Sequence, residues 1–478
     1  MKQKLLSKRR TKIICTIGPA TCSAMAIERL ILAGMNIARL NLSHGTHREH
    51  SRYIQTIRRV SQRLDINVAI LMDLPGPKYR TGRMRGGQAL LKNRSQVTLT
   101  TRQVVGNARL IPVNLPNLPR DVKAGDLVLL DDGAMQLRVL KKDGTEVYCR
   151  VIAGGMLTEG RGVVVPGMRI SGPFITDSLK ENLIFAISKQ PEFIALSFVS
   201  SADDVKAVRD LLRKSNANIP LITKIERGDA VSKFDSILAI GDGVMVARGD
   251  LGVDIPLERV PIVQKEIVQK CNHVGKPVII ATQMLESMIN AARPTRAEVT
   301  DIANAIFDGA DATMLSAETS IGRYPVPAVT IMAKIAREAE NKLPYDQILT
   351  ERGRYLEHKT DELISYSACH TADSLEAKAI VAFTRSGSTA GRVSKYRPRV
   401  PILAITPDGN VCRRLLLRWG VHPIQIPEQK SIDGLFATGV RLAREMKIAR
   451  PGDLIVITGG IPLGVAGSTN LLKVEKVT

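Results

Sequence analysis

At 478 residues, 44% hydrophobic and 24% charged, the chain has the size and composition of a water-soluble protein with two or three domains. Its 68 basic and 46 acidic residues give a net charge of +22, which favours anionic ligands. Because the basic residues are spread along the whole chain and form no nucleic-acid-binding motif, we expect no nucleic-acid partner. No apolar run approaches the roughly 20 residues that span a bilayer, and the basic N-terminus lacks the apolar core of a signal peptide, so we expect a cytoplasmic protein without a membrane partner.

Eight short apolar runs recur in the first two thirds of the chain, separated by amphipathic stretches of helical period such as SAMAIERLILAG and DDVKAVRDLLRKS. The runs are centred on Ile13, Ile37, Ala69, Ala195, Thr223, Val246, Ile279 and Met314. Successive centres are 23 to 35 residues apart, except for one step of 126 residues. Six such units could form an open doubly wound sheet, whereas eight predict a closed (β/α)8 TIM barrel, which we favour.

The long step marks an insertion after the third strand. Residues 82–165 lack helical periodicity and predict a small all-β barrel that forms a lid over the carboxyl ends of the strands. After residue 343, a new alternation of strand and helix patterns predicts an α/β domain with an open sheet. We therefore expect a barrel domain of residues 1–81 and 166–343, a lid of residues 82–165 and a C-terminal domain of residues 344–478.

Three histidines, His44, His47 and His50, lie close together after the second predicted strand. They could bind a metal, but a polar loop that leads into a helix is the simpler interpretation, and we expect that one. The six cysteines are scattered without a CxxC pair, which argues against a zinc site or a disulfide framework.

The apolar strands end in polar residues, and active sites of TIM barrels lie where the strands end. Arg39, Asn41 and Ser43 alternate, so they share one face of an extended segment. Lys224 and Glu226 share a face in the same way. Each of these residues alone could be a cap or a surface ion pair, but burying charge in a barrel without a function is costly.

Glu226 together with Asp250 predicts a Mg²⁺ or Mn²⁺ site, since two carboxylates plus water and substrate oxygens suit a hard divalent cation. Arg39 and Lys224 then favour an anionic substrate, and the amides that follow Arg248 could bind a carboxylate or phosphate. A metal, an arginine and a lysine at one point are typical of phosphoryl transfer. The usual kinase motifs (Walker A, the kinase catalytic loop, GxGxxG) are absent from the sequence.

Several long motifs resemble the pyruvate kinase family, in family order and over nearly the whole chain: KIICTIGPAT, MNIARLNLSHGTHREH, TKIE, VMVARGDLGVDIP, ATQMLESM and RPTRAEVTDIANAIFDGADATMLSAETSIGRYP. The resemblance implies a glycolytic homotetramer that transfers the phosphoryl group of phosphoenolpyruvate to ADP, giving pyruvate and ATP. It implies substrate contacts or catalytic roles for Arg39, Lys224, Gly249, Asp250 and Thr282, with Glu226 and Asp250 as metal ligands. It places the nucleotide phosphates beside Asn41, Ser43, His44, Arg80 and Arg161, the last of which replaces the usual lysine of the family.

The segment MDLPGPKYRTG, residues 72–82, departs from the family pattern. The resemblance implies a K⁺ pocket formed by Asn41, Ser43, Asp73 and Leu74, with Leu74 contributing its backbone carbonyl. The family usually has glutamate where Lys78 stands, and a lysine there is associated with K⁺-independent enzymes. We predict that Lys78 acts as an internal cation with Asp73 as its partner, so that K⁺ can bind without being required. The alternative is a lysine that faces solvent over an intact K⁺ site.

The C-terminal domain contains the loop Thr384, Arg385, Ser386, Gly387, Ser388 and Thr389 after a strand. Hydroxyls, a glycine and an arginine can surround a phosphate, and the loop resembles the effector site of the family, which implies a phosphorylated allosteric effector. A plain strand–helix turn is the alternative.

Two other functions are compatible with parts of the sequence. Another metal-dependent TIM-barrel enzyme of phosphoenolpyruvate or pyruvate would share the metal and the arginine but would not need the lid. An RNA-binding protein would use the basic charge and would bind RNA without Lys224.

Overall fold

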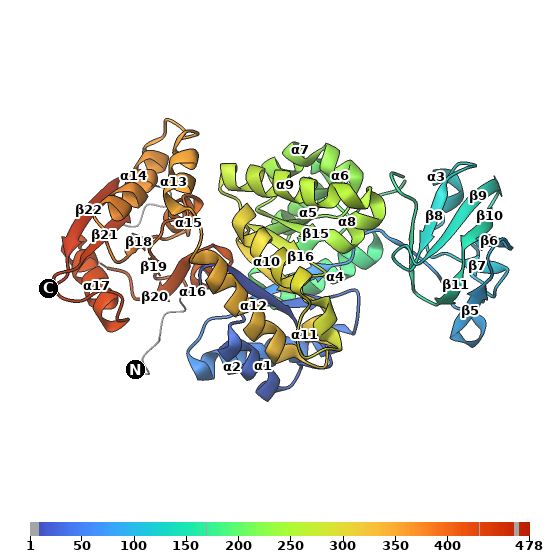
Figure 1. The fold of residues 1–478 in the computed structure, drawn as a ribbon, viewed down its shortest axis with the longest axis horizontal. Coiled ribbons are helices and arrows are strands. Elements are labelled where there is room, and N and C mark those ends of the chain that lie inside the picture. The colour runs from blue at the N-terminus through green and yellow to red at the C-terminus, as the bar shows by residue number, and fades with distance from the viewer. Residues whose placement is uncertain (1–8, 169, 430, 463–467) are drawn as a thin grey trace.

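Eight parallel strands form a closed barrel at the centre of the protein, as the apolar runs predicted (Figure 1). The computed structural model describes residues 9–168, 170–429, 431–462 and 468–478. The order around the barrel is β1-β17-β16-β15-β14-β13-β3-β2. The strands are β1 (Lys12–Thr16), β2 (Ile37–Asn41), β3 (Ala69–Leu74), β13 (Phe193–Leu196), β14 (Leu221–Ile225), β15 (Gly243–Ala247), β16 (Val278–Ala281) and β17 (Ala312–Leu315).

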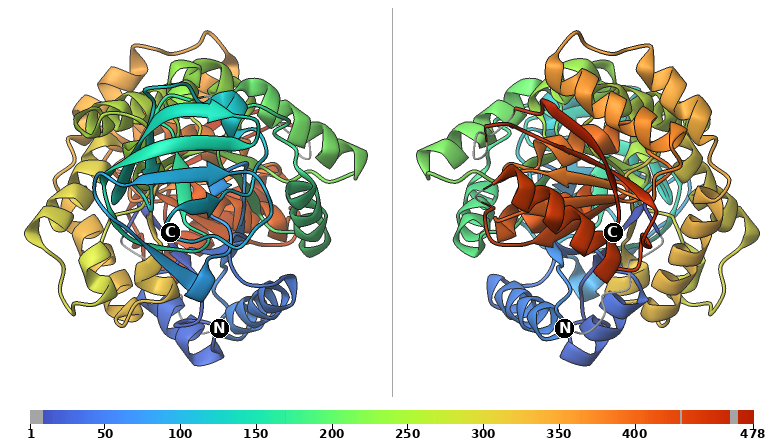
Figure 2. Two further views of the ribbon diagram at one scale, coloured as in Figure 1. Left: turned by 90° about the vertical axis from the view of Figure 1, so that its right-hand side faces the viewer. Right: turned by 90° about the vertical axis from the view of Figure 1, so that its left-hand side faces the viewer.

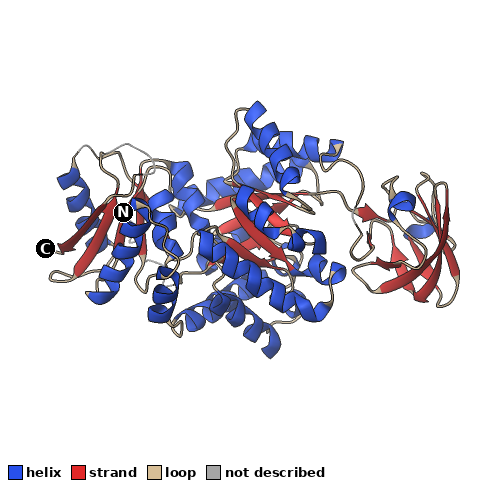
Figure 3. Ribbon diagram, turned by 90° about the horizontal axis from the view of Figure 1, so that it is seen from above, coloured by secondary structure: helices blue, strands red, loops and turns tan. Residues whose placement is uncertain are grey.

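Helices surround the barrel strands, as the view from above shows (Figure 3). Helix α5 illustrates how the sequence specifies them: Ser201 and Asp204 form a capping box at its start, and Val205, Val208 and Leu212 form its buried stripe. The helices of this part are α1 (Ala24–Ala33), α2 (His47–Leu64), α4 (Asp177–Lys189), α5 (Ala202–Lys214), α6 (Gly228–Ser232), α7 (Phe234–Ile240), α8 (Arg248–Asp254), η2 (Leu257–Arg259), α9 (Val260–Val274), η3 (Glu286–Ile289), α10 (Arg296–Asp308), α11 (Ala317–Ser320) and α12 (Pro325–Glu340).

The inserted domain is built on a seven-stranded sheet in the order β4-β12-β8-β9-β10-β6-β7, with a separate pair β11-β5. Gly82 N donates to Pro112 O (2.8 Å) and Asn114 N to Arg80 O (3.0 Å), so the two edge strands meet and the sheet curls into a small barrel. Its elements are β4 (Tyr79–Arg80), η1 (Arg85–Gly87), β5 (Gln88–Leu91), β6 (Gln96–Thr100), β7 (Leu110–Pro112), α3 (Leu118–Asp121), β8 (Leu127–Leu130), β9 (Met135–Asp143), β10 (Glu146–Ala153), β11 (Gly155–Thr158) and β12 (Gly162–Val164). Because β4 pairs with β12, the sheet of this domain begins at Tyr79, before the boundary that the sequence pattern placed after residue 81.

The C-terminal domain contains an open five-stranded sheet in the order β20-β19-β18-β21-β22, in which only β22 is antiparallel. Its elements are α13 (Tyr345–Gly353), α14 (Thr360–Ser374), β18 (Ile380–Phe383), α15 (Ser388–Lys395), β19 (Ile402–Thr406), α16 (Gly409–Arg414), η4 (Leu415–Leu417), β20 (Val421–Gln425), α17 (Ile432–Glu445), β21 (Leu454–Gly459) and β22 (Leu471–Lys476). Among the described residues, no helix has the length and apolarity needed to cross a bilayer.

The inserted domain and the C-terminal domain lie at opposite ends of the barrel (Figures 1 and 2). The chain enters the inserted domain directly after the carboxyl end of β3. The C-terminal domain meets the opposite end, where Lys12 at the start of β1 donates to Val421 O. Leu416 and Leu417 of η4 join the apolar cluster inside the barrel, with Ile14, Leu71 and Ile279. The carboxyl ends of the strands therefore face the inserted domain, and the amino ends face the C-terminal domain.

Candidate active site

Arg39 and Asp73 form a buried ion pair at the carboxyl ends of neighbouring strands β2 and β3. Arg39 Nε and Nη2 lie 2.8 and 2.7 Å from Asp73 Oδ2. Arg39 Nη1 also donates to Thr16 Oγ1 at 3.0 Å, because Thr16 is its register partner on β1. The side chain of Asp73 is only 1% exposed, so its charge depends on this pairing.

Lys224, at the end of β14, joins this pair to Glu226. Its Nζ lies 3.3 Å from Asp73 Oδ1 and 2.9 Å from Glu226 Oε1. All four side chains are buried, and they form a continuous row of alternating charges, Arg39–Asp73–Lys224–Glu226. The structure thus brings together residues that are far apart in the sequence, as the strand-end pattern predicted.

The pKa values of these groups follow from burial and from the neighbouring charges. Burial would raise the pKa of Asp73, but Lys224 and Arg39 outweigh it and hold that pKa below its ordinary value. Burial would lower the pKa of Lys224, and Asp73 and Glu226 raise it above its ordinary value instead. The pKa of Glu226 is raised, first by burial and then by Asp250, although Lys224 opposes both. Neighbouring positive charge therefore compensates the carboxylate of Glu226 less completely than that of Asp73.

Ser197 and Phe198, which follow β13, belong to the site although the sequence analysis did not select them. Ser197 Oγ accepts from Lys224 Nζ at 2.7 Å and donates to Asp73 Oδ1 at 3.1 Å. Phe198 N donates to Glu226 Oε2 at 2.6 Å, and its φ of 58° places it in the left-handed region. The signal for Ser197 was its position, since it follows an apolar strand in the same way as the other site residues.

Thr282 and Gly249 form the next part of the rim. Gly249 N donates to Thr282 Oγ1 at 2.8 Å, and Thr282 Oγ1 donates to Ala281 O at 2.5 Å. Thr282 and Gln283 have φ values of 68° and 55°, so the chain after β16 is held in a strained conformation, as is common at functional sites. Arg248 holds this segment in place, since its Nη2 donates to Thr282 O at 2.8 Å.

Lys78 does not pair with Asp73, and that prediction was wrong. Its Nζ lies 2.5 Å from Asp250 Oδ1, because α8 brings Asp250 next to the segment that leads from β3 into the inserted domain. Asp73 is instead surrounded by Arg39, Lys224 and Ser197. Lys78 is a member of the site, but its carboxylate partner is a predicted metal ligand.

The donors at Glu226 and Asp250 fit a divalent cation. The two carboxylates are close enough for Asp250 to raise the pKa of Glu226, and both line one small cavity with Lys78 and Phe198. Within the described ranges no group of three or more His, Cys, Asp or Glu side chains is arranged to hold a metal. Two carboxylates therefore leave most of the coordination sphere to water and substrate, as is usual for Mg²⁺.

Of the residues expected around K⁺, Asp73 belongs to the buried row, Leu74 follows it in β3, and Asn41 is its register partner on β2. Leu74 O, the expected carbonyl ligand, accepts from Ser197 N at 3.3 Å. Asn41 Oδ1 accepts from Ser43 N at 3.2 Å, and both residues precede the exposed His44. Burial lowers the pKa of His44, and the positive charges of Arg80 and Arg39 lower it further.

Arg161 of the inserted domain bonds within that domain, to Thr158 Oγ1 at 2.5 Å and to Asp131 Oδ1 at 3.3 Å. The ring of His50 bonds to the backbone carbonyl of His44 and the ring of His47 to Asn182 Oδ1, and α2 starts at His47 behind a capping box. This is the polar loop leading into a helix that the sequence favoured.

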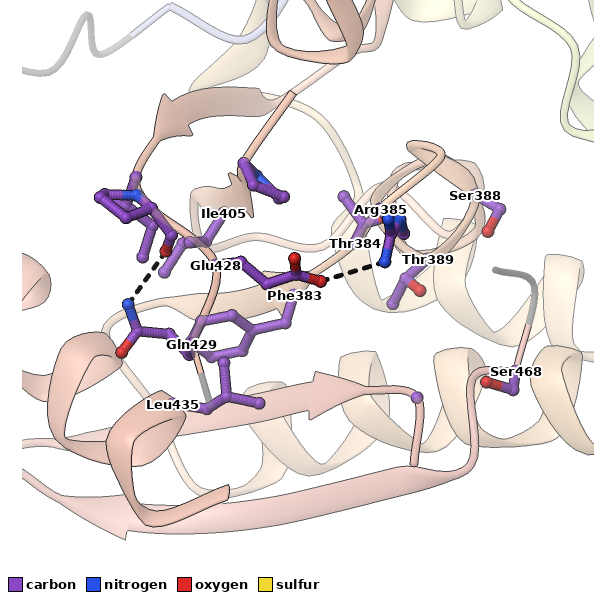
Figure 4. A pocket seen from close by; sticks show the side chains of 14 residues that line it. Phe383, Thr384, Arg385, Ser388, Thr389, Ile405, Glu428, Gln429, Leu435 and Ser468 are labelled. Carbon is purple, nitrogen blue, oxygen red and sulfur yellow. Dashed lines mark hydrogen bonds and ion pairs between the residues drawn. The ribbon is translucent and has the colours of Figure 1, made fainter. Parts of the chain in front are cut away.

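A second site candidate, the loop of residues 384–389 in the C-terminal domain, lines a pocket together with Phe383, Ile405 and Leu435 (Figure 4). Gly387 has a φ of 90° and donates its N–H to Thr384 Oγ1 at 2.9 Å. Ser386 Oγ donates to Ser388 Oγ at 3.1 Å. Arg385 pairs with Glu428 across the pocket at 3.0 Å.

Comparisons with known proteins identify the family to which the chain belongs. The family models of the pyruvate kinase barrel domain and the pyruvate kinase alpha/beta domain match residues 8–329 and 362–475. A pyruvate kinase of Clostridium acetobutylicum is 45% identical over 471 residues, 98% of this chain and 100% of that protein. One of Staphylococcus saprophyticus is 47% identical over 472 residues, 98% of this chain and 80% of that protein. A crystal structure of a pyruvate kinase from Cryptosporidium parvum superimposes with a TM-score of 0.93 at 36% identity, covering 98% of this chain and 97% of the other. Family models that match most of the chain, together with relatives of this identity and coverage, show that the chain belongs to the pyruvate kinase family.

Proposed function

We propose that this chain transfers the phosphoryl group of phosphoenolpyruvate to ADP at the carboxyl end of its barrel, in a Mg²⁺-dependent and K⁺-independent reaction. One observation carries the residue roles: the buried row Arg39–Asp73–Lys224–Glu226. Such a row is costly to bury and is oriented toward the end of the barrel where these enzymes bind substrates.

Arg39 and Lys224 are the groups that neutralise the substrate. Arg39 binds the phosphate of phosphoenolpyruvate, and its guanidinium is held in place by Asp73 and Thr16. Lys224 stabilises the transferring phosphoryl group and the enolate that it leaves behind. The raised pKa of Lys224 keeps its amine charged throughout.

Glu226 and Asp250 hold the divalent cation, for which Mn²⁺ can substitute. When bound, Mg²⁺ supplies the positive charge that draws the substrate oxygens together and offsets the charge that builds up during transfer. The amides of Gly249 and Asp250 bind the substrate carboxylate, which replaces Thr282 Oγ1 as the acceptor of the Gly249 N–H. Thr282 then takes part in protonating the enolate to pyruvate.

The ADP side is formed by the edge of the site and the lid. We assign the nucleotide phosphates to Asn41, Ser43, His44, Arg80 and Arg161. Arg161 reaches this position when the inserted domain closes, since its side chain now contacts Thr158 and Asp131 of that domain. Lys78 supplies, from its position beside Asp250 and not through Asp73, the positive charge that K⁺ would otherwise bring to the site.

One assay tests the reaction and the role of K⁺ together. We expect ATP to form from phosphoenolpyruvate and ADP with Mg²⁺ in tetramethylammonium buffer, and added K⁺ to leave the rate unchanged. Lys78→Glu should then need K⁺ for full activity. A wild-type enzyme that works only with K⁺ would contradict the internal cation and leave the kinase reaction in place, while no ATP in either buffer would refute the reaction.

We further propose that the loop of residues 384–389 binds a phosphorylated effector. We also propose that the protein is a cytoplasmic homotetramer and that its domain boundaries lie near residues 81, 165 and 343. The hydroxyls of the loop and Arg385 support the effector site. A saturation curve for phosphoenolpyruvate that AMP and sugar phosphates leave unchanged would refute the effector site. Sedimentation, cell fractionation and limited proteolysis test the assembly, the location and the boundaries.

A further inference from the structure

The ion pair between Lys78 and Asp250 connects the segment that leads into the inserted domain to α8 of the barrel. Nζ and Oδ1 are 2.5 Å apart, and the two side chains are 13% and 28% exposed. Lys78 directly precedes β4, whereas Asp250 lies on α8, 172 residues later in the chain. The pair is therefore a tertiary contact between two parts of the molecule and not a local one.

The end of the lysine side chain is held by further contacts. Its Nζ also lies 5.1 Å from the centroid of the Phe198 ring, a cation–π contact. Its Cε passes Gly162 on β12 so closely that a Cβ there would lie 3.0 Å away. Gly162 is paired with Arg80 of β4, so the lysine side chain lies beside the strand through which the chain leaves the inserted domain.

The same carboxylate cannot serve the lysine and a divalent cation equally. A cation bound to Asp250 needs the lone pairs that Nζ now uses, and an ammonium beside it would repel it. Lys224 makes a similar contact with Glu226, but that lysine is part of the buried row and is needed for the substrate. Lys78 can leave Asp250 without depriving a fully buried carboxylate of its counter-charge, because the side chain of Asp250 is 28% exposed.

We propose that Lys78 is a tethered counter-cation that occupies Asp250 until a divalent cation displaces it, and that this exchange loosens the inserted domain from the barrel. The proposal rests on the assignment of Asp250 as a metal ligand under Proposed function. Lys78 acts here as a positioning residue: it keeps the empty carboxylate neutralised and makes metal binding and the position of the inserted domain depend on each other. By linkage, each must then affect the other by the same factor.

Direct metal binding tests the displacement without turnover. Free Mn²⁺ is measured by electron paramagnetic resonance during titration of the protein in tetramethylammonium buffer, with no substrate present. We expect Lys78→Met to bind Mn²⁺ about fivefold more tightly than wild type, since an ion pair of this exposure no longer competes. Lys92→Met, which removes an exposed lysine of the inserted domain, is the matched control and should bind like wild type.

A double-mutant cycle shows whether the effect passes through Asp250. In the Asp250→Asn background, Lys78→Met should leave Mn²⁺ affinity unchanged, because the carboxylate for which the two cations compete is gone. Lys78→Gln, which keeps a polar side chain, should repeat the result of Lys78→Met. Unchanged or weaker Mn²⁺ binding in both Lys78 variants would overturn the proposal.

Hydrogen exchange tests the coupling to the inserted domain. Mn²⁺ should speed amide exchange in residues 76–82 of the wild type, whereas in Lys78→Met exchange should be fast already and insensitive to Mn²⁺. No effect of Mn²⁺ on this segment in the wild type would overturn the coupling. A wild type that binds Mn²⁺ but forms no ATP would refute the proposed reaction instead, so the two failures are distinguishable.

Discussion

At the scale of single residues, Asp73 is the group on which the barrel mouth depends most. It is almost fully buried and receives Arg39, Lys224 and Ser197 at once. Without its charge, two cations would stand next to each other in a poorly solvated site, and each would lose the contact that fixes its direction. Asp73 thus positions both cations that we propose as substrate contacts.

We expect Asp73→Asn to lower kcat by about a hundredfold or more and to reduce the free energy of unfolding by about 3–5 kcal/mol, as breaking a buried ion pair does. Steady-state kinetics and urea denaturation measure the two effects. Asp203→Asn, which removes the carboxylate of an exposed pair with Lys206, is the control and should change neither.

The lowered pKa of Asp73 adds a pH dependence with a definite sign. Because the folded state keeps the carboxylate ionised to lower pH than the unfolded state does, its contribution to stability is complete above about pH 4 and is lost as the pH falls through the folded-state pKa. The stability difference between wild type and Asp73→Asn should therefore shrink on acidification below about pH 4. A difference that stays constant from pH 6 to pH 3 would contradict this account.

At the scale of elements, the one-turn helix η4 closes the floor of the barrel. Leu417 is 1% exposed, and with Leu416 it lies in the same apolar cluster as the inward-facing side chains of the eight strands. The barrel core is thus completed by a segment of another domain. Glu192, just before β13, strengthens the contact, since it pairs with Arg58 of α2 and with Arg413 of α16.

Leu417→Ala should destabilise the barrel and not only the C-terminal domain. We expect a loss of about 2–5 kcal/mol, the usual cost of truncating a buried leucine, seen as a lower denaturation midpoint for the barrel. Leu32→Ala on α1, where leucine is 64% exposed, provides the comparison and should change stability little. Equal effects of the two substitutions would show that η4 does not belong to the barrel core.

At the scale of the whole molecule, the barrel carries the inserted domain at one end and the C-terminal domain at the other. The floor contains buried charge as well as leucines. Lys12 is 3% exposed and donates to Val421 O at 2.7 Å, and Asp311 pairs with Arg397 of the C-terminal domain at 2.7 Å. Burial, and next Arg9, lower the pKa of Lys12 to about 7, although Glu340 and Asp311 oppose the shift.

The domain interface should accordingly become more stable as the pH rises above neutrality. Between pH 7 and about pH 10 the unfolded chain keeps a proton on Lys12 that the folded chain has released, so stability increases with pH. Relative to Lys12→Met, the wild type should gain up to about 1.4 kcal/mol per pH unit over part of this range. Urea denaturation of both proteins at pH 7, 8 and 9 measures the difference, and parallel stabilities would contradict a lysine that loses its proton in the floor.

Periodicity and strand ends were enough to predict much of this protein. The apolar runs identified all eight barrel strands, since a buried parallel strand needs a short apolar run whatever its partners are. Polar residues at the strand ends identified Arg39, Lys224, Glu226 and Asp250, because the carboxyl ends of the strands of a barrel meet at one place. Ser197 was missed, since a serine after a strand is most often only a cap or part of a turn.

The sequence by itself determined the barrel, the insertion, the C-terminal sheet and the family, because these depend on local patterns and on long motifs. Only the tertiary structure decided which cation meets which carboxylate and what closes the barrel floor. From the sequence alone, either Asp73 or Asp250 could be the ion-pair partner of Lys78, and the position of α8 places Asp250 next to it. Leu416 and Leu417 carry no sequence signal for a barrel core, because a contact between domains is set by where two separately folded surfaces meet.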